Sequence, residues 1–253
     1  MLRIILIGAT GAMGKTLAGL VKEDESYKIV AGVAEKAENC CGFPIYDKIG
    51  DIKEEGDVII DFSSRKLLDD IIGFAKEKSY PLVFATTGYT DEDLAKINGL
   101  CENIAFIQEG NYSLGINVMV DLAETLARAL KDFDIEIIES HHNKKKDNPS
   151  GTANMIFDSV NKGRDGKLFK KMRNFSHDDS RDGNEVGISS VRAGTIVGEH
   201  RLILAGLDET IEIKHQAASK KIFANGALKA ASFLIGKKPG RYAFSEVIRG
   251  END

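Results

Sequence analysis

The sequence has 253 residues and a net charge of −5, with 42% hydrophobic and 29% charged residues. This length is enough for one large or two small domains with a sizeable core. The negative charge and the scattered Lys and Arg residues argue against nucleic acid or an anionic membrane as a partner. The sequence shows no signal peptide and no apolar run of the roughly 18 residues that a membrane span needs, so we expect a cytoplasmic protein.

The chain contains three cysteines, Cys40, Cys41 and Cys101. Adjacent Cys40 and Cys41 lack the spacing of a metal site, and an odd number does not suit a disulfide framework. We therefore expect reduced thiols, as in a cytoplasmic protein.

The first part of the chain alternates short apolar runs with helical patterns. Strands are predicted at residues 2–7, 29–34, 58–60, 82–85 and 104–107, and helices at residues 14–21 and 67–75. Such runs are typical of strands that are buried on both faces of a parallel sheet. Their alternation with helices predicts right-handed βαβ units, hence an α/β domain with a Rossmann-type doubly wound parallel sheet.

The second part has a different pattern and predicts a mixed α+β domain. A long helix is expected at residues 114–130, a strand at 135–138, and a helix that begins at Ser150 or Gly151. The polar residues 161–185 indicate a long mobile loop. The last elements are strands at 186–191, 200–205 and 210–215, and a helix at 219–235. Short turns between these strands favour an antiparallel meander, and the last helix could belong to either domain.

A glycine-rich turn, Gly8-Ala9-Thr10-Gly11-Ala12-Met13-Gly14, joins the first strand to the first helix. Gly8 permits a tight turn, Gly11 lets a pyrophosphate approach the backbone, and Gly14 lets helix and strand pack closely. The helix N-terminus then offers N–H groups and a positive dipole end to the phosphates. Glu35 ends the second strand, where a carboxylate can accept hydrogen bonds from ribose hydroxyls. We interpret the turn as a dinucleotide site, although such glycines also occur in ordinary turns.

The segment Glu139 to Ala153 reads ESHHNKKKDNPSGTA and leads from a buried strand into a helix. Pro149 stiffens the helix entry, and Ser150-Gly151-Thr152 supplies a capping hydroxyl and N–H groups, which together favour a site for a carboxylate. Histidine and lysine beside it can polarise a substrate or deliver a proton. No second cluster of Cys, His and carboxylate residues accompanies them, so we expect no metal.

This segment matches E-x-H-H-x-x-K-x-D-x-P-S-G-T-A, and the chain closely resembles the 4-hydroxy-tetrahydrodipicolinate reductase family of lysine and diaminopimelate biosynthesis, also called dihydrodipicolinate reductases. The resemblance spans the whole chain. It includes the glycine turn, Asp61-Phe62-Ser63, Thr86-Thr87-Gly88-Tyr89, Asn111-Tyr112-Ser113, Val191-Arg192-Ala193-Gly194, Gly198-Glu199-His200 and Phe223-Ala224-Asn225-Gly226-Ala227.

The resemblance implies that NADH or NADPH delivers a hydride to 4-hydroxy-2,3,4,5-tetrahydrodipicolinate, with loss of water, to give tetrahydrodipicolinate. His141 would be the catalytic histidine and Lys145 the proton donor, and the substrate carboxylates would bind at His142, Gly151 and Thr152. Cofactor-binding residues would be Gly8, Ala9, Thr10, Gly11, Ala12, Met13, Glu35, Lys36, Ala85, Thr86, Thr87, Glu109, Gly110, Asn111 and Tyr112.

The resemblance also implies a division of the chain and an assembly. Residues 1–112 and 223–253 would form the dinucleotide-binding domain, and residues 113–222 the substrate-binding domain that builds a homotetramer. We expect the domains to close about hinges near Ser113 and Ile222, since substrate and nicotinamide bind to different domains.

The sequence departs from the family pattern at three places. Many members have arginine in place of Ala12, where it contacts the 2′-phosphate of NADPH, and many have glycine in place of Ala85. The pair Glu109-Gly110 replaces one that is usually small and apolar, which leaves the Glu109 carboxylate unexplained. Lys36 could pair with a 2′-phosphate that Glu35 would repel, or could be an ordinary surface lysine, so the choice between NADH and NADPH stays open.

Two other functions are compatible with the same scaffold. Another NAD(P)H-dependent reductase could act on a small amino-acid-derived carbonyl or imine, because one fold hosts many reactions. A binding protein that senses NADH would need the glycine turn and none of the acid–base residues. Turnover of a different carbonyl substrate would favour the former, and nucleotide binding without turnover the latter.

Overall fold

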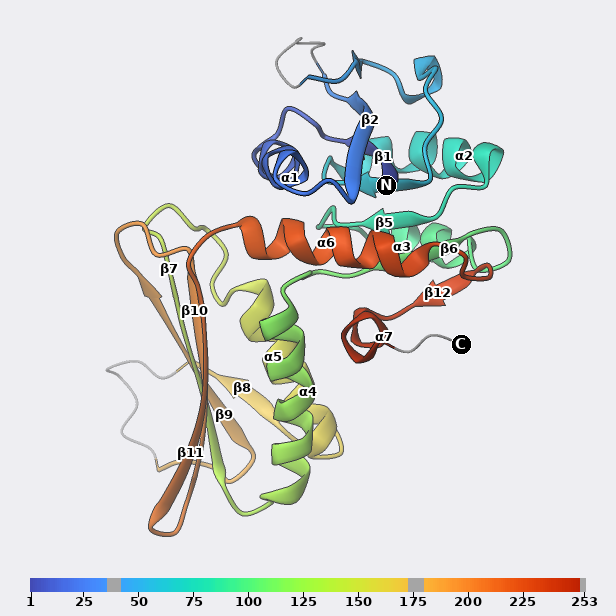
Figure 1. Cartoon of the computed structure of the whole chain (residues 1–253). Helices are drawn as coiled ribbons and strands as arrows, with labels where there is room; N and C mark the ends of the chain where they lie inside the picture. The colour runs from blue at the N-terminus through green and yellow to red at the C-terminus, as the bar shows by residue number, and fades with distance from the viewer. Residues whose placement is uncertain (36–41, 173–179, 251–253) are drawn as a thin grey trace. The chain divides into compact units, whose positions relative to one another are not determined.

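The computed structural model describes residues 1–35, 42–172 and 180–250, so the predictions for Lys36, Cys40 and Cys41 lie outside the described residues (Figure 1). Cys101 is a free, exposed thiol. The chain divides into two compact units: a first unit of Met1–Ser113 and Lys220–Asp253, and a second unit of Leu114–Ser219. Within the described residues, no helix combines the length and apolarity that crossing a membrane requires.

The first unit contains a seven-stranded sheet with the order β12-β6-β5-β4-β1-β2-β3, in which all paired strands are parallel. The strands are β1 (Leu2–Ile7), β2 (Tyr27–Val33), β3 (Ile45–Tyr46), β4 (Val58–Asp61), β5 (Leu82–Phe84), β6 (Ala105–Gln108) and β12 (Gly240–Tyr242). The central strands are buried on both faces, which is why they read as continuous apolar runs. The predicted Rossmann-type fold of this part is confirmed.

Helices cover both faces of this sheet. They are α1 (Ala12–Lys22), α2 (Leu68–Lys78), α3 (Asp91–Asn98), α6 (Lys221–Leu234) and α7 (Phe244–Arg249), with short 3₁₀ turns at Ile49–Asp51 and Arg65–Leu67. Side chains of α2 and α3 form one apolar cluster with Ile5, Ile7 and Ile59 of the sheet. On the other face, α1 packs against α6, which also contacts β4, β5 and β6. The helix predicted at residues 219–235 corresponds to α6, which is part of the first unit.

The second unit is a five-stranded sheet with the order β11-β10-β7-β9-β8 and two helices on one face (Figure 1). Its elements are α4 (Leu114–Ala129), β7 (Asp134–His141), α5 (Gly151–Gly163), β8 (Phe169–Lys171), β9 (Glu185–Arg192), β10 (Gly198–Gly206) and β11 (Glu209–Ala217). Ile135 and Ile137 of β7 pack with Leu202 of β10 against Met119 and Ile156 of the two helices. These contacts fix which face of β7 is inside.

The antiparallel meander predicted for the last strands is wrong. β10 and β11 do form an antiparallel hairpin, but β9 pairs in parallel with β7, so β7 lies between β9 and β10. An alternating pattern identifies the buried face of a strand and does not identify its neighbour. The long loop predicted at residues 161–185 is also wrong in part, because α5 continues to Gly163 and residues 169–171 form β8, which pairs with β9.

Candidate active site

The glycine turn of the first unit follows β1 directly. Gly8 has φ +81°, and a Cβ on Gly8 would overlap the carbonyl oxygen of Phe62, while one on Gly14 would overlap that of Gly8. The N–H groups of Gly8 and Ala9 donate to the carbonyl of Val33 at 2.9 and 3.0 Å, which ties the turn to β2. Gly8 and Gly14 therefore have no room for a side chain, because neighbouring backbone carbonyl groups lie where a Cβ would be.

The start of α1 is suited to an anion. Its N-cap is Gly11, and no side chain of the described residues caps it, so the first N–H groups and the positive dipole end are left for a ligand. Gly11 and Ala12 are exposed, and Met13 and Thr10 are half-buried. A pyrophosphate would fit at this position, because a helix N-terminus with uncapped N–H groups stabilises negative charge.

The other predicted cofactor residues of the first unit follow the carboxyl ends of three parallel strands. Glu35 is exposed just after β2, Ala85 to Thr87 follow β5, and Glu109 to Tyr112 follow β6. Because the strands are parallel, these segments and the glycine turn lie along one edge of the sheet. In open α/β sheets, ligands bind at this edge.

The side chains behind that edge are locked by hydrogen bonds. The Tyr112 hydroxyl lies 2.8 Å from the carbonyl oxygen of Phe84 and 3.1 Å from that of Ile107, so it ties the ends of β5 and β6 together. The Asn111 side chain accepts a hydrogen bond from the N–H of Ser113 at 2.8 Å. These hydrogen bonds hold the ends of β5 and β6 and the loop that follows β6 in place.

Asp61 ends β4 fully buried, and its carboxylate accepts hydrogen bonds from the N–H and hydroxyl of Ser63 and from the Tyr89 hydroxyl. Burial raises the pKa of Asp61, although these hydrogen bonds oppose the shift. Burial also raises the pKa of Tyr89, so its hydroxyl stays a donor.

Glu109, unexplained by the sequence, has a partner in the structure. Its carboxylate accepts a hydrogen bond from the N–H of Phe244 at 3.4 Å, at the first residue of α7. Burial raises the pKa of Glu109. The ring of Phe244 is fully buried and lies edge-on to Tyr112, with ring centroids 5.3 Å apart. Glu109 therefore joins the β6 loop to the C-terminal helix.

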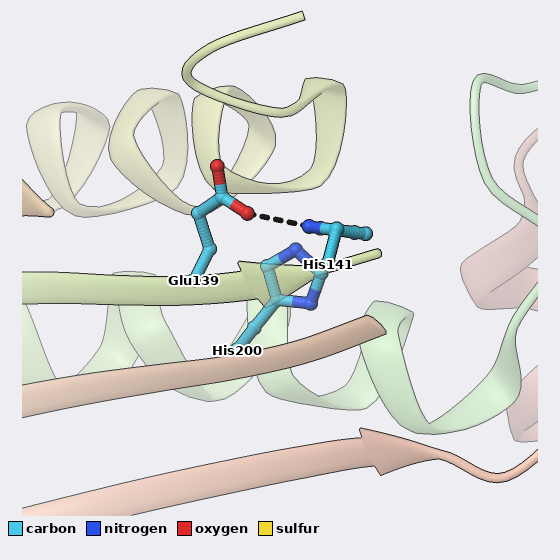
Figure 2. Close-up of side chains that lie close together, drawn as sticks. All are labelled: Glu139, His141 and His200. Atoms are coloured by element: carbon cyan, nitrogen blue, oxygen red, sulfur yellow. Dashed lines mark hydrogen bonds and ion pairs between the residues drawn. The ribbon is translucent and has the colours of Figure 1, made fainter. Parts of the chain in front are cut away.

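In the second unit, a buried polar cluster lies where β7 ends and α5 begins. Glu139 and His141 continue the inner face of β7 after Ile135 and Ile137. Strand register places His200 of β10 opposite Glu139, and Arg192 of β9 opposite His141. Figure 2 shows Glu139, His141 and His200 side by side, with a hydrogen bond that joins the first two.

Glu139 is the centre of this cluster and is fully buried. Its carboxylate accepts hydrogen bonds from Nδ1 of His141 at 2.5 Å, from both terminal nitrogens of Arg192 at 2.7 and 2.9 Å, and from the N–H of Ser150 at 3.2 Å. Burial alone would raise the pKa of Glu139, but Arg192 and its other partners hold that pKa below its ordinary value. Glu139 is therefore an anion at neutral pH.

An ionised Glu139 fixes the state of His141. A carboxylate only accepts hydrogen bonds, so Nδ1 of His141 carries a proton and Nε2 is left for chemistry. Burial lowers the pKa of His141, and the positive charges of Lys145 and Arg192 add to this, while Glu139 opposes it. Nε2 faces Gly198, where a Cβ would lie 3.2 Å away, so the absence of a side chain there keeps the approach open. His141 is suited to exchange a proton with a ligand.

Lys145 lies in the turn after His141, with its N–H bonded to the carbonyl of His142 at 3.1 Å. Its ammonium contacts the Asp147 carboxylate at 2.9 Å, and its side chain is 22% exposed. Burial would raise the pKa of Asp147, but Lys145 and backbone N–H groups, including that of Gly151, hold that pKa below its ordinary value. A carboxylate of the chain itself thus lies between Lys145 and the first turn of α5.

The N-terminus of α5 completes the cluster. Ser150 is its N-cap, and the Ser150 hydroxyl oxygen accepts the N–H of Ala153 at 3.1 Å. Gly151 and Thr152 form the first helical turn, with Gly151 exposed. His142 is half-buried in the preceding segment. The structure therefore brings His141, His142, Lys145, Gly151 and Thr152 into one region of the second unit, around a helix end that favours anions.

Glu139, His141 and His200 could each direct one ligand atom to a metal, because these atoms lie within 4.8 Å of one another. However, Arg192 already binds both oxygens of Glu139, and its guanidinium would repel a divalent cation there. The cluster fits a hydrogen-bonded network better than a metal centre.

Sequence reasoning assigned no role to Glu139, Arg192, His200, Asp147 or Asp61. A signal for two of them was present in the sequence. Glu139 continues the alternating apolar face of Ile135 and Ile137, and His200 continues that of Leu202 and Leu204. A polar residue at a position that the alternation marks as buried must find a partner, which indicates a network.

Comparison with known proteins agrees with this geometry. Family models described as dihydrodipicolinate reductase, N-terminus and C-terminus, match residues 2–112 and 115–248. A protein of Caldanaerobacter subterraneus subsp. tengcongensis named 4-hydroxy-tetrahydrodipicolinate reductase is 44% identical over 98% of this chain and 99% of its own length. A protein of the same name from Clostridium tetani is 43% identical over 96% of this chain and 95% of its own.

A solved structure from a Paenisporosarcina species, described as dihydrodipicolinate reductase with dipicolinate bound, has the same fold. It aligns with a TM-score of 0.80 over 96% of this chain and 97% of that one, at 22% identity. A structure described as the DAP dehydrogenase of C. glutamicum in complex with DAP shares the fold more distantly, with a TM-score of 0.58 at 11% identity over 99% of this chain and 96% of its own. From the two family models and the full-length relatives, the chain belongs to the dihydrodipicolinate reductase family, that of the 4-hydroxy-tetrahydrodipicolinate reductases.

Proposed function

We propose that this chain reduces 4-hydroxy-2,3,4,5-tetrahydrodipicolinate to tetrahydrodipicolinate, in the pathway to diaminopimelate and lysine. In this reaction a hydride and a proton enter the ring and one water leaves. The observation that supports it most strongly is the Glu139–His141 pair, which lies beside Lys145 and the N-terminus of α5. This combination supplies an anion site and two proton-transfer groups in one place.

The first unit would hold the cofactor, and its residues fit a dinucleotide. Gly8 and Gly14 leave no space for side chains, and the uncapped start of α1 would hold the pyrophosphate. Glu35 would accept hydrogen bonds from the ribose next to the adenine. The loops of Ala85 to Thr87 and Glu109 to Tyr112 would contact the nicotinamide, and NADH or NADPH supplies the hydride when bound.

The substrate carboxylates would bind at the start of α5. The N–H groups of Gly151 and Thr152 and the side chain of Thr152 would hold one carboxylate, because a helix N-terminus stabilises negative charge. His142 would lie beside this carboxylate. Asp147, which interacts with Lys145 and Gly151, marks a position that a carboxylate already favours. A dicarboxylate related to dipicolinate, the ligand of the Paenisporosarcina structure, suits such a site.

Proton transfer would be divided between two residues. The ring carbon next to the one that receives the hydride needs a proton, and the Lys145 ammonium would donate it. His141, held by Glu139 with Nε2 toward the ligand, would assist the transfer and polarise the substrate. Closure of the two units about hinges near Ser113 and Ile222 would bring the substrate and the nicotinamide together for hydride transfer.

The assembly and the location belong to the same proposal. The face of the second sheet away from α4 and α5 carries half-buried Ile138 and Ile203 and exposed Val191, and it would form the interface of a homotetramer. Multi-angle light scattering would give the mass of a tetramer, and that of a monomer would contradict the assembly. A cytoplasmic location would give the enzyme access to the NAD(P)H pool.

The experiment that tests the function is oxidation of NADH and of NADPH, with the substrate made in the same cuvette by the preceding synthase. Oxidation that depends on the synthase supports the proposal. Oxidation with another carbonyl or imine alone would instead indicate a different reductase. Nucleotide binding without any turnover would indicate a sensor.

A further inference from the structure

His200 is a buried histidine to which neither the family motif nor the reaction assigns a task. It lies on β10 opposite Glu139, and only 4% of its surface is exposed. Its ring stands edge-on to that of His141, with ring centroids 5.1 Å apart (Figure 2). His200 thus contacts both the proposed catalytic histidine on β7 and the N-cap residue of α5.

The contact of His200 that reaches the substrate site is with Ser150. Nε2 of His200 lies 3.1 Å from the Ser150 hydroxyl oxygen, which also accepts the N–H of Ala153. The N–H of Ser150 donates to Glu139 at 3.2 Å. Ser150 is thus held at its backbone by Glu139 and at its side chain by His200, and it is almost completely buried.

We propose that His200 is a positioning residue of the substrate site: its Nε2–Ser150 hydrogen bond fixes the first turn of α5, where Gly151 and Thr152 bind a substrate carboxylate. This inference rests on the proposed function. The hydrogen bond can act only through the Nε2 side of the ring, since Nδ1 of His200 has no hydrogen-bond partner among the described residues.

The surroundings of His200 favour a positioning role over a role in proton transfer. Burial, with a contribution from the positive charge that His141 can carry, lowers the pKa of His200 to about 3. A ring with so low a pKa is neutral near pH 7. A neutral, buried imidazole that is hydrogen-bonded to the N-cap of α5 is suited to hold that helix end in place.

Two amide substitutions separate the two nitrogens of the ring. The side-chain amide of His200→Gln reaches the position of Nε2, while that of His200→Asn reaches only the position of Nδ1. Dipicolinate, titrated by calorimetry into the intact protein, reports the carboxylate site without turnover. We expect His200→Asn to weaken dipicolinate binding about tenfold and His200→Gln to keep it within about threefold, because one hydrogen bond is at stake. NADH binding should not change in either variant.

A double-mutant cycle with Ser150→Ala shows whether the effect passes through Ser150. Ser150→Ala alone should weaken dipicolinate binding about tenfold, and adding His200→Asn to it should cause no further loss. Ser150→Ala removes the same hydrogen bond from the other side, so it also serves if His200→Asn does not fold.

Several results would overturn the proposal. These are normal dipicolinate binding by His200→Asn, a greater loss in His200→Gln than in His200→Asn, or losses that add in the double variant. A purely structural histidine would lower the melting temperature and leave dipicolinate affinity unchanged. If the wild-type protein turns over the substrate and one of these results is found, only the role of His200 fails. If the wild type shows neither turnover nor dipicolinate binding, the proposed function fails with it.

Discussion

Arg192 of β9 lies opposite His141 of β7, and its guanidinium donates hydrogen bonds to both oxygens of Glu139, the carboxylate that holds His141. Three neighbouring strands, β9, β7 and β10, thus contribute side chains to the same buried cluster. The charge on Glu139 that orients His141 persists because Arg192 balances it. The proposed catalytic histidine therefore depends on a residue that need not contact the substrate.

Arg192→Leu should destabilise the protein strongly, because it leaves the Glu139 carboxylate buried without a cation. We expect the free energy of unfolding in urea to fall by about 3 kcal/mol. Arg201→Leu is the matched control, since Arg201 forms a solvent-exposed ion pair with Glu212 and its loss should destabilise the protein far less. Equal losses in the two variants would show that the buried charge pair has no special role.

Lys145→Ala and His141→Ala should each lower kcat by about 10²–10⁴-fold, since each removes a proposed proton-transfer group. Binding of NADH, measured by fluorescence, should change little, because both residues lie in the second unit. Lys144→Ala and Lys146→Ala are controls within the same basic run and should keep near-normal kcat, because both side chains are solvent-accessible and have no assigned role. Near-normal kcat in Lys145→Ala would remove Lys145 from its role.

Gly14→Ala should destabilise the first unit and weaken NADH binding, because its Cβ would meet the carbonyls of Gly8 and Ala9. Gly19 lies in the same helix, and a Cβ added there would have open space, with no neighbouring atom within 4 Å. Gly19→Ala should therefore stabilise the helix slightly, by up to about 1 kcal/mol. Thermal unfolding and an NADH titration of both variants measure these effects. Equal melting temperatures and equal NADH affinities in Gly14→Ala and Gly19→Ala would show that α1 can move away from the turn.

Ala12→Arg should shift the ratio of kcat/KM for NADPH to that for NADH upward, by about tenfold. Ala12 is exposed at the start of α1, where a guanidinium could pair with a 2′-phosphate. The ratio comes from initial rates with each cofactor at saturating substrate supply. An unchanged ratio would show that residue 12 does not reach the 2′ position.

Acid should destabilise the protein partly through His200. Because its pKa falls from about 6.5 in the unfolded chain to about 3 in the folded one, the unfolded state binds more protons between these values. The contribution of His200 to the free energy of unfolding is therefore fully present above pH 6.5. It is lost as pH falls toward 3, by at most about 1.4 kcal/mol per pH unit. His200→Gln should flatten the dependence of unfolding free energy on pH between 6.5 and 4. Parallel curves for variant and wild type would contradict this.

The sequence predicts the fold class because its two signals are strong. Continuous apolar runs such as that ending at Ile7 indicate strands buried on both faces, and the glycine turn indicates a helix directly after the first of them. Short elements carry little periodicity, so β3, β12 and α7 were not predicted. The pairing of β9 with β7 was missed because it depends on contacts between segments far apart in the chain.

The part of the candidate site that lies in one short segment could be predicted from the sequence. His141, Lys145 and Thr152 lie close together in sequence, in a segment whose composition alone indicates an anion site with acid–base groups. Arg192 and His200 reach the cluster through strand register, which the sequence does not reveal. The partner of the Glu109 carboxylate is the N–H of Phe244, the first residue of α7, and the sequence does not show that these two residues are neighbours.

The most direct test of the central claim follows the hydride itself. The protein is supplied with NADH that carries deuterium at C4, in each stereospecific form in turn, and with substrate from the synthase, and the product is examined by mass spectrometry. We predict tetrahydrodipicolinate that is heavier by one mass unit with one of the two labelled forms. Product without deuterium from either form, or no product from the dicarboxylate, would contradict the account.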